Sequence, residues 1–157
     1  MIDKVLFICI GNICRSPMAE GLFKQALPEK LVFSAGIDAP VGESADPLSV
    51  QLMRERGIDI RAHRARKLGS WMVHEADLIV TMDRYQKYFI EINYPMFKNK
   101  VCRLGEFDNY DIPDPYLQGL NAFREACSLI DKGVGELVAR IGKKSNRNGV
   151  ACVRDFL

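Results

Sequence analysis

The 157-residue sequence lacks the features that define several large classes of protein. Its longest apolar run, Val5–Ile10, is shorter than the about 20 residues of a membrane-spanning helix and the about 7 to 15 of a signal-peptide core. Net charge is small, because 22 Lys and Arg stand against 20 Asp and Glu, and no basic coat for nucleic acid is indicated. We therefore expect no membrane or nucleic-acid partner and a location in the cytoplasm.

Signatures of nucleotide and metal sites are also missing. The chain has neither the Gly-x4-Gly-Lys-Ser/Thr loop of nucleoside triphosphate binding nor the three spaced glycines of dinucleotide binding. Its two histidines, His63 and His74, do not have the spacing of zinc ligands. The odd number of cysteines, five, indicates reduced thiols rather than a disulfide framework. We expect no cofactor and no metal.

What is present is a regular alternation of strands and helices in one domain. The predicted strands are Lys4–Cys9, Leu31–Ala35, Asp77–Met82 and Val101–Leu104. The first predicted helix has Ser16 as N-cap and Pro17 in its first turn, and the second has Asp46 as N-cap and Pro47 in its first turn and ends at Gly57. The third is capped by Asp83 and carries an apolar face of Tyr85, Tyr88, Phe89 and Ile92. The last runs from Leu120 to Ile141.

This alternation predicts an α/β fold, a single open four-stranded parallel sheet with helices on both faces, of the Rossmann or flavodoxin type. Residues 1–142 would form this domain, and the polar stretch that opens residues 143–157 suggests a poorly ordered tail. Ligands of such sheets bind beyond the carboxyl ends of the strands.

The first strand ends in a Cys-x5-Arg loop, Cys9-Ile-Gly-Asn-Ile-Cys-Arg15, directly before a helix. Backbone N–H groups of such a loop and of the first helical turn can converge on one anion, and Arg15 adds a fork that holds two phosphate oxygens. Gly11 and Asn12 tolerate the left-handed backbone angles this requires. The positive electrostatic potential of these N–H groups and of Arg15 also stabilises a thiolate, so Cys9 is predicted to be a nucleophile in phosphate chemistry.

Departure of an alcohol or phenol from phosphorus is faster when an acid protonates the leaving oxygen. Asp111-Ile-Pro-Asp-Pro-Tyr116 follows the fourth strand and should reach the same sheet edge as the Cys9 loop. The segment supplies a candidate acid, although Asp-Pro is also common in ordinary surface turns.

These residues resemble the low-molecular-weight protein tyrosine phosphatases, from about Val5 to Ile141, and look most like the bacterial branch. The matching motifs are Cys9-Ile-Gly-Asn-Ile-Cys-Arg-Ser-Pro17, Ser34-Ala-Gly36, Ala45-Asp-Pro47, His63-Arg-Ala-Arg66, Met82-Asp83 and Asp114-Pro-Tyr116. The resemblance implies a phosphotyrosine phosphatase I-like fold and hydrolysis of phosphotyrosine and small aryl phosphates.

Site roles are likewise implied by the resemblance. Cys9 would become phosphocysteine, Arg15 would bind phosphate, and Asp114 would be the general acid and later activate water. The other implied positions are the phosphate loop Ile10, Gly11, Asn12, Ile13, Cys14, Arg15 and Ser16, the slot residues Ile13, Pro40 and Tyr116, and the supporting network Asn12, Ser16, Ser34 and His63. The implied partner is a phosphotyrosine protein such as a tyrosine autokinase of exopolysaccharide control, and the enzyme would be a monomer or weak dimer.

Cys14 is predicted to be the redox partner of Cys9, because both lie in one tight loop and a neighbouring thiol can condense with a sulfenic acid. Cys102 and Cys127 are interpreted as packing residues. The basic run of Arg54, Arg56, Arg61, Arg64, Arg66 and Lys67 is interpreted as a solvated face.

Three other functions remain open on this scaffold. An arsenate reductase would need further redox cysteines, and residues 70–100 contain none. A protein-arginine phosphatase would be expected to carry a smaller polar Thr where this chain has Ile13. A phosphate-binding module without catalysis would not need Cys9, Arg15 and Asp114 together.

Overall fold

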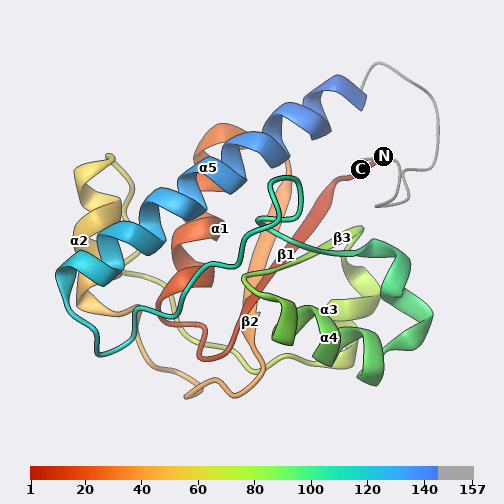
Figure 1. The fold of residues 1–157 in the computed structure, drawn as a ribbon, viewed down its shortest axis with the longest axis horizontal. Helices are drawn as coiled ribbons and strands as arrows, with labels where there is room; N and C mark the ends of the chain where they lie inside the picture. Colours follow the sequence, from red (N-terminus) through yellow and green to blue (C-terminus); the bar gives the residue numbers. More distant parts are fainter. Residues whose placement is uncertain (145–157) are drawn as a thin grey trace.

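A four-stranded parallel sheet forms the centre of the computed structural model, which describes residues 1–144 (Figure 1). The strands lie in the order β2-β1-β3-β4, and their bounds are β1 Lys4–Cys9, β2 Leu31–Gly36, β3 Leu78–Thr81 and β4 Val101–Arg103. In the register, Cys9 lies opposite Gly36 and Ile8 lies opposite Thr81, so the carboxyl ends share one edge. The predicted open parallel sheet is confirmed.

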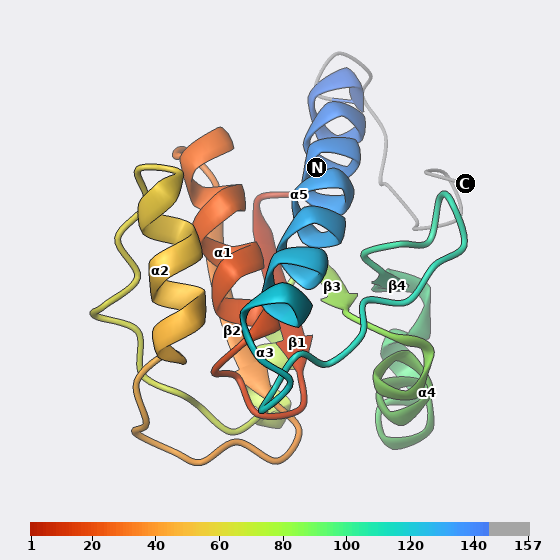
Figure 2. The same cartoon turned by 60° about the vertical axis from the view of Figure 1, so that its left-hand side comes forward.

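Helices cover both faces of this sheet. Side chains alternate along a strand, so Val5 and Phe7 face one side while Leu6 and Ile8 face the other. The first side packs against α1 Arg15–Ala26, α2 Pro47–Glu55 and α5 Leu120–Lys144, and the second against α3 Ser70–Glu75 and α4 Arg84–Asn93. A 3₁₀ segment, η1 Pro95–Lys100, joins α4 to β4. Figure 2 shows α1, α2 and α5 together, with α4 apart from them.

Two of the predicted helix starts are confirmed by their caps. The Asp46 carboxylate accepts a hydrogen bond from the Leu48 N–H at 2.9 Å, with Pro47 as the first residue of α2. The Asp83 carboxylate accepts from the Gln86 N–H at 3.0 Å and caps α4.

The predicted N-cap role of Ser16 is wrong. Helix α1 begins two residues earlier than predicted, at Arg15, and the capping position belongs to Cys14, whose side chain makes no capping bond. The Ser16 hydroxyl instead contacts Cys9 Sγ and the side chain of Asn12. The Ser16 hydroxyl, which helix propensity assigns to a cap, therefore contacts Cys9 and Asn12 instead.

The predicted apolar face of α4 is also wrong. Tyr85, Tyr88 and Ile92 are 82%, 65% and 59% exposed, whereas Gln86 and Ile90 are fully buried. Gln86 points inward because its amide oxygen accepts from the Met82 N–H and its amide nitrogen donates to Asp83, which satisfies a polar side chain inside the protein. These two bonds decide which face the helix buries.

Smaller differences concern element lengths. Helix α3 was not predicted, β3 is shorter than expected, and α5 continues beyond Ile141 to Lys144. Residues 145–157, most of the predicted tail, lie outside the described residues, so that prediction stays untested. Within residues 1–144 no helix has the length and hydropathy needed to cross a membrane.

Candidate active site

The loop between β1 and α1 surrounds the sulfur of Cys9 at the carboxyl edge of the sheet. Cys9 is the last residue of β1 and is 2% exposed. Its Sγ accepts a hydrogen bond from the Asn12 N–H at 3.1 Å and lies 2.9 Å from Ser16 Oγ. Both contacts stabilise negative charge on the sulfur, as does the N-terminus of α1 that follows the loop.

Asn12 fixes the shape of this loop and is fully buried. Its φ of 54° is left-handed, and its side-chain amide donates to Ser16 Oγ at 2.8 Å and to Ser34 Oγ at 2.9 Å. The amide oxygen accepts from the Arg66 N–H at 2.9 Å, and His63 Nε2 donates to the Asn12 carbonyl oxygen at 2.7 Å. The structure thus brings together every residue of the predicted supporting network.

Glu20 completes this network, and the sequence reasoning missed it. The Ser34 hydroxyl donates to its carboxylate, and His63 Nδ1 lies 3.9 Å from the same oxygen. Since Ser34 gives its proton to Glu20, it must accept from Asn12, and Asn12 in turn donates to Ser16. This direction leaves the Ser16 proton pointing at Cys9, as a thiolate requires.

Arg15 is held rigidly at the opposite side of the loop. It is 2% exposed, and its Nη1 donates to the Ile112 carbonyl oxygen at 2.8 Å and to Asp83 Oδ2 at 3.1 Å. Its Nη2 lies 3.7 Å from Asp114 Oδ2. Asp83 was predicted only as a helix cap; its position directly after β3, on the shared edge, was the available signal for a second role.

The two candidate acids differ in their surroundings. Burial alone would raise the pKa of Asp111, but hydrogen bonds from Arg103 and Arg84 outweigh it and hold that pKa below its ordinary value. Asp114 is half exposed at the pocket and accepts a backbone hydrogen bond from Tyr116 at 3.1 Å. Asp111 is therefore stabilised as a carboxylate, whereas the side chain of Asp114 is open to solvent and to the pocket.

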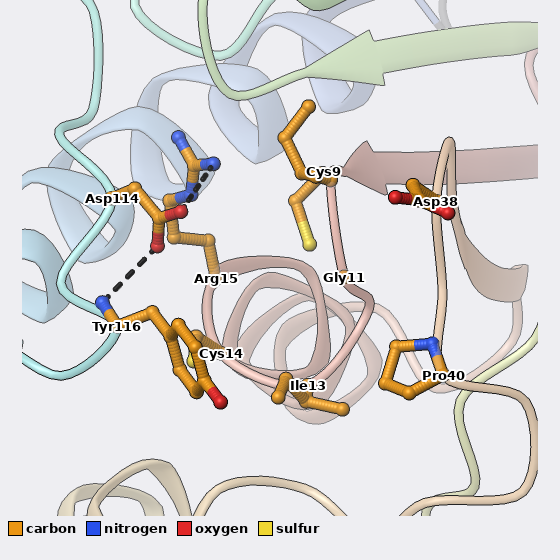
Figure 3. A pocket seen from close by; sticks show the side chains of 10 residues that line it. Cys9, Gly11, Ile13, Cys14, Arg15, Asp38, Pro40, Asp114 and Tyr116 are labelled. Carbon is orange, nitrogen blue, oxygen red and sulfur yellow. Dashed lines mark hydrogen bonds and ion pairs between the residues drawn. The ribbon is translucent and has the colours of Figure 1, made fainter.

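A pocket lined by Cys9 has a volume of about 570 Å³, which includes space open to solvent. The predicted slot residues Ile13, Pro40 and Tyr116 all line it (Figure 3). Tyr116 stands beside Asp114, across the opening from Pro40. Ile10, which was predicted as part of the phosphate loop, and Asp38, which was not predicted, also line the pocket.

The other three thiols within residues 1–144 have raised pKa values. Burial, together with the nearby Asp46 carboxylate, raises the pKa of Cys14 well above its ordinary value. Burial raises the pKa of Cys102 to about 12 and also raises that of Cys127. Cys102 and Cys127 lie in the hydrophobic core, as predicted.

A parallel α/β sheet with a Cys-x5-Arg loop at its carboxyl edge and an aspartate at the pocket is typical of phosphatases with a cysteine nucleophile. The chain belongs to the family of low molecular weight phosphotyrosine protein phosphatases, whose model matches residues 4–147. It is therefore a protein tyrosine phosphatase, a hydrolase.

Individual relatives agree with this assignment. The chain is 50% identical over 141 residues to the probable low molecular weight protein-tyrosine-phosphatase EpsP of Ralstonia nicotianae, covering 90% of this chain and 97% of that protein. The structure of the tyrosine phosphatase Wzb from Escherichia coli K30 with sulphate superposes with a TM-score of 0.87 at 32% identity, covering 90% and 100% of the two chains. The YwlE arginine phosphatase from Geobacillus stearothermophilus has the same TM-score at 29% identity, covering 93% and 97%.

Proposed function

We propose that the protein hydrolyses phosphotyrosine through a phosphocysteine intermediate. The Cys9 thiolate attacks phosphorus while the bond to the phenolic oxygen breaks, and Asp114 donates its proton to that oxygen. The Asp114 carboxylate then takes a proton from water, whose oxygen attacks phosphorus, and inorganic phosphate leaves with Cys9 restored as the thiolate. The observation that carries this proposal is the donor chain that aims Ser16 and the Asn12 N–H at Cys9 Sγ.

Arg15 and the loop amides are proposed to hold the phosphate through both steps. The loop comprises Ile10 to Ser16, and its N–H groups together with the α1 N-terminus favour a dianion. Because Asp83 and the Ile112 carbonyl fix one side of the guanidinium, little reorganisation is needed when charge develops on the phosphoryl oxygens.

The walls of the pocket favour an aromatic phosphate ester over a phosphoguanidine. Ile13 and Pro40 are apolar, and Tyr116 supplies an aromatic ring beside the acid. A charged guanidinium would lose water here without gaining a partner from Ile13, which counts against arginine phosphatase activity despite the likeness to YwlE. The absence of cysteine from residues 70–100 counts in the same way against arsenate reduction.

The natural substrate is proposed to be a phosphotyrosine protein, specifically a tyrosine autokinase of exopolysaccharide control. Support for the autokinase comes from the resemblance to the bacterial branch alone. A location in the cytoplasm and a monomer or weak dimer belong to the same proposal.

The experiment is to trap the intermediate. Wild-type enzyme mixed with a phosphotyrosyl peptide and quenched in acid should carry one phosphate on Cys9 by peptide mass spectrometry. Cys9→Ser should be inactive and unlabelled, whereas Cys127→Ser, which changes a core thiol outside the pocket, should be labelled like wild type. Turnover by Cys9→Ser, or phosphate on any other residue of the wild type, would exclude this mechanism.

A further inference from the structure

The segment 63–68 runs directly beside the loop that forms one wall of the pocket, as the traces near the carboxyl edge in Figures 1 and 2 show. Gly42 N–H donates to the Ala65 carbonyl oxygen at 2.9 Å, and Ala65 N–H donates to that of Glu43 at 2.8 Å. Glu43 N–H in turn donates to the carbonyl oxygen of Pro40, which lines the pocket, at 3.0 Å. The segment is therefore attached to the wall through a single turn.

Three exposed cations lie on this segment: Arg64, Arg66 and Lys67, here named the basic rim. Arg66 is anchored to the catalytic loop, because its N–H donates to Asn12 Oδ1 and its carbonyl oxygen accepts from Gly36. Lys67 forms a backbone bridge with Gly36, at the end of β2. The rim therefore borders the phosphate loop as well as the pocket wall.

The rim lacks the carboxylate partners that cations have elsewhere in the fold. Arg84 pairs with Asp111 at 3.0 Å and Arg124 with Glu55 at 2.9 Å. In the part of the chain that the structure describes, no rim residue forms an ion pair, although the carboxylates of Asp38 and Glu43 belong to the adjacent loop. Within the described residues, the three cations of the basic rim are thus available to pair with carboxylates of a ligand at the pocket.

Arg64 is also oriented before any ligand arrives. Its Nη1 donates to the carbonyl oxygens of His63 at 2.7 Å and Arg61 at 3.1 Å. These bonds use one nitrogen of the guanidinium and restrict the side chain, so less rotamer entropy is lost when a carboxylate binds the others.

We propose that the basic rim binds acidic side chains flanking the phosphotyrosine of the substrate protein. An extended segment advances about 3.3 to 3.6 Å per residue, so Asp or Glu within about three residues of the phosphotyrosine lies near the pocket mouth. At physiological ionic strength the screening length is about 8 Å, so the rim attracts those acidic side chains that come within about this distance of one of its cations. The inference rests on the proposed function and names its preferred substrate class, acidic phosphotyrosyl segments.

The size of the rim favours a peptide over a membrane. Polybasic segments that recognise anionic lipid typically contain about four to eight Lys and Arg. The rim has three, and two further arginines of the same basic run, Arg56 and Arg61, are paired with Asp131 and Asp59.

The test compares kcat/KM for three phosphotyrosyl peptides of equal length whose flanking residues are Glu, Gln or Lys. Wild type should prefer the Glu peptide over the Gln peptide by about fivefold, since one exposed ion pair contributes about 1.5- to fivefold and two rim residues can engage. The preference should shrink when ionic strength rises from about 0.01 M to about 1 M, where screening shortens from about 30 Å to about 3 Å.

Variants locate the effect on the rim. Arg64→Gln/Lys67→Gln should bring the Glu-to-Gln ratio close to one. The matched control, Lys24→Gln/Lys98→Gln, removes the same charge from exposed positions on α1 and η1 and should keep the wild-type ratio. Because Arg64 also binds backbone carbonyls, Lys67→Glu provides a second variant, and it should shift the preference toward the Lys peptide.

The outcomes separate this inference from the proposed function. Equal turnover of all three peptides by wild type, or an acidic preference that survives in the rim variants, overturns the rim and leaves the phosphatase proposal intact. Rim-dependent binding to anionic vesicles or RNA without a peptide preference also overturns it. Failure to hydrolyse any of the three peptides would contradict the proposed function itself.

Discussion

Replacing Asn12 tests the most densely bonded side chain of the site. In Asn12→Ala the loop loses three hydrogen bonds, those to Ser16 Oγ, to Ser34 Oγ and from the Arg66 N–H, all between 2.8 and 2.9 Å. The replacement must also keep a φ of 54°, which asparagine tolerates better than alanine does. Asn12→Gly loses the same three bonds but has no Cβ to strain.

The two losses give a magnitude for each variant. Each hydrogen bond contributes about 1 kcal/mol net, so their removal costs about 3 kcal/mol at this fully buried position. The left-handed angle adds about 1 kcal/mol for alanine alone. We therefore expect the free energy of unfolding to fall by about 4 kcal/mol in Asn12→Ala and about 3 kcal/mol in Asn12→Gly, a large share of the about 5 to 15 kcal/mol typical of a domain.

Urea denaturation followed by circular dichroism measures both values. With a slope of about 2 kcal/mol per molar urea, the midpoint should fall by about 2 M for the alanine variant and about 1.5 M for the glycine variant. Equal midpoints for the two variants would refute the argument from backbone strain. A loss below about 1 kcal/mol in both would show that the network contributes little to stability.

Three further predictions concern the chemistry. Asp114→Asn should lower the rate of hydrolysis of aryl phosphates with poor leaving groups by about 10² to 10⁴ and abolish the high-pH limb of the bell-shaped rate profile. An equal loss of rate for substrates with good leaving groups would indicate that another residue is the acid. Ile13→Thr should raise phosphoarginine turnover relative to phosphotyrosine, and an unchanged ratio would contradict the slot argument. After peroxide treatment, wild type should regain activity with thiol reductant through a Cys9–Cys14 disulfide, whereas Cys14→Ser should recover less. Since burial raises the pKa of Cys14, disulfide formation should accelerate with rising pH, and identical recovery of the two proteins would remove Cys14 from the switch.

Sheet topology was predictable because each strand and helix is specified by residues close together in the chain. The apolar run ending at Cys9, the cap and proline at Asp46 and Pro47, and Gly57 with its φ of 74° all act within a few positions. The failures occur where a side chain bonds to a neighbouring loop or helix group in a way that helix propensity and apolar spacing do not describe. Ser16 gives up capping for Cys9 and Asn12, and buried Gln86 reverses the face of α4.

The same division applies to the site. The Cys-x5-Arg loop reveals the proposed nucleophile and the phosphate-binding arginine because both lie within one short segment, residues 9–15. Glu20, and the second role of Asp83 beside its cap, were not predicted because they depend on contacts with Ser34 and Arg15, 14 and 68 positions away. Spacing within a helix or after a strand does not reveal which residue another element will bring opposite it.

The carboxylates around the pocket illustrate how one functional group serves opposite purposes. Asp111 is bound by Arg84 and Arg103, which hold its pKa below its ordinary value, whereas Asp83 accepts hydrogen bonds from Arg15 and Gln86 and helps to position that arginine. Asp114 has one backbone donor and a distant 3.7 Å contact with the same Arg15. In the proposed mechanism, a phosphate dianion in the loop competes with Asp114 for this guanidinium. In that mechanism the Asp114 carboxyl group gives its proton to the leaving oxygen and, after the leaving group has departed, accepts one from water.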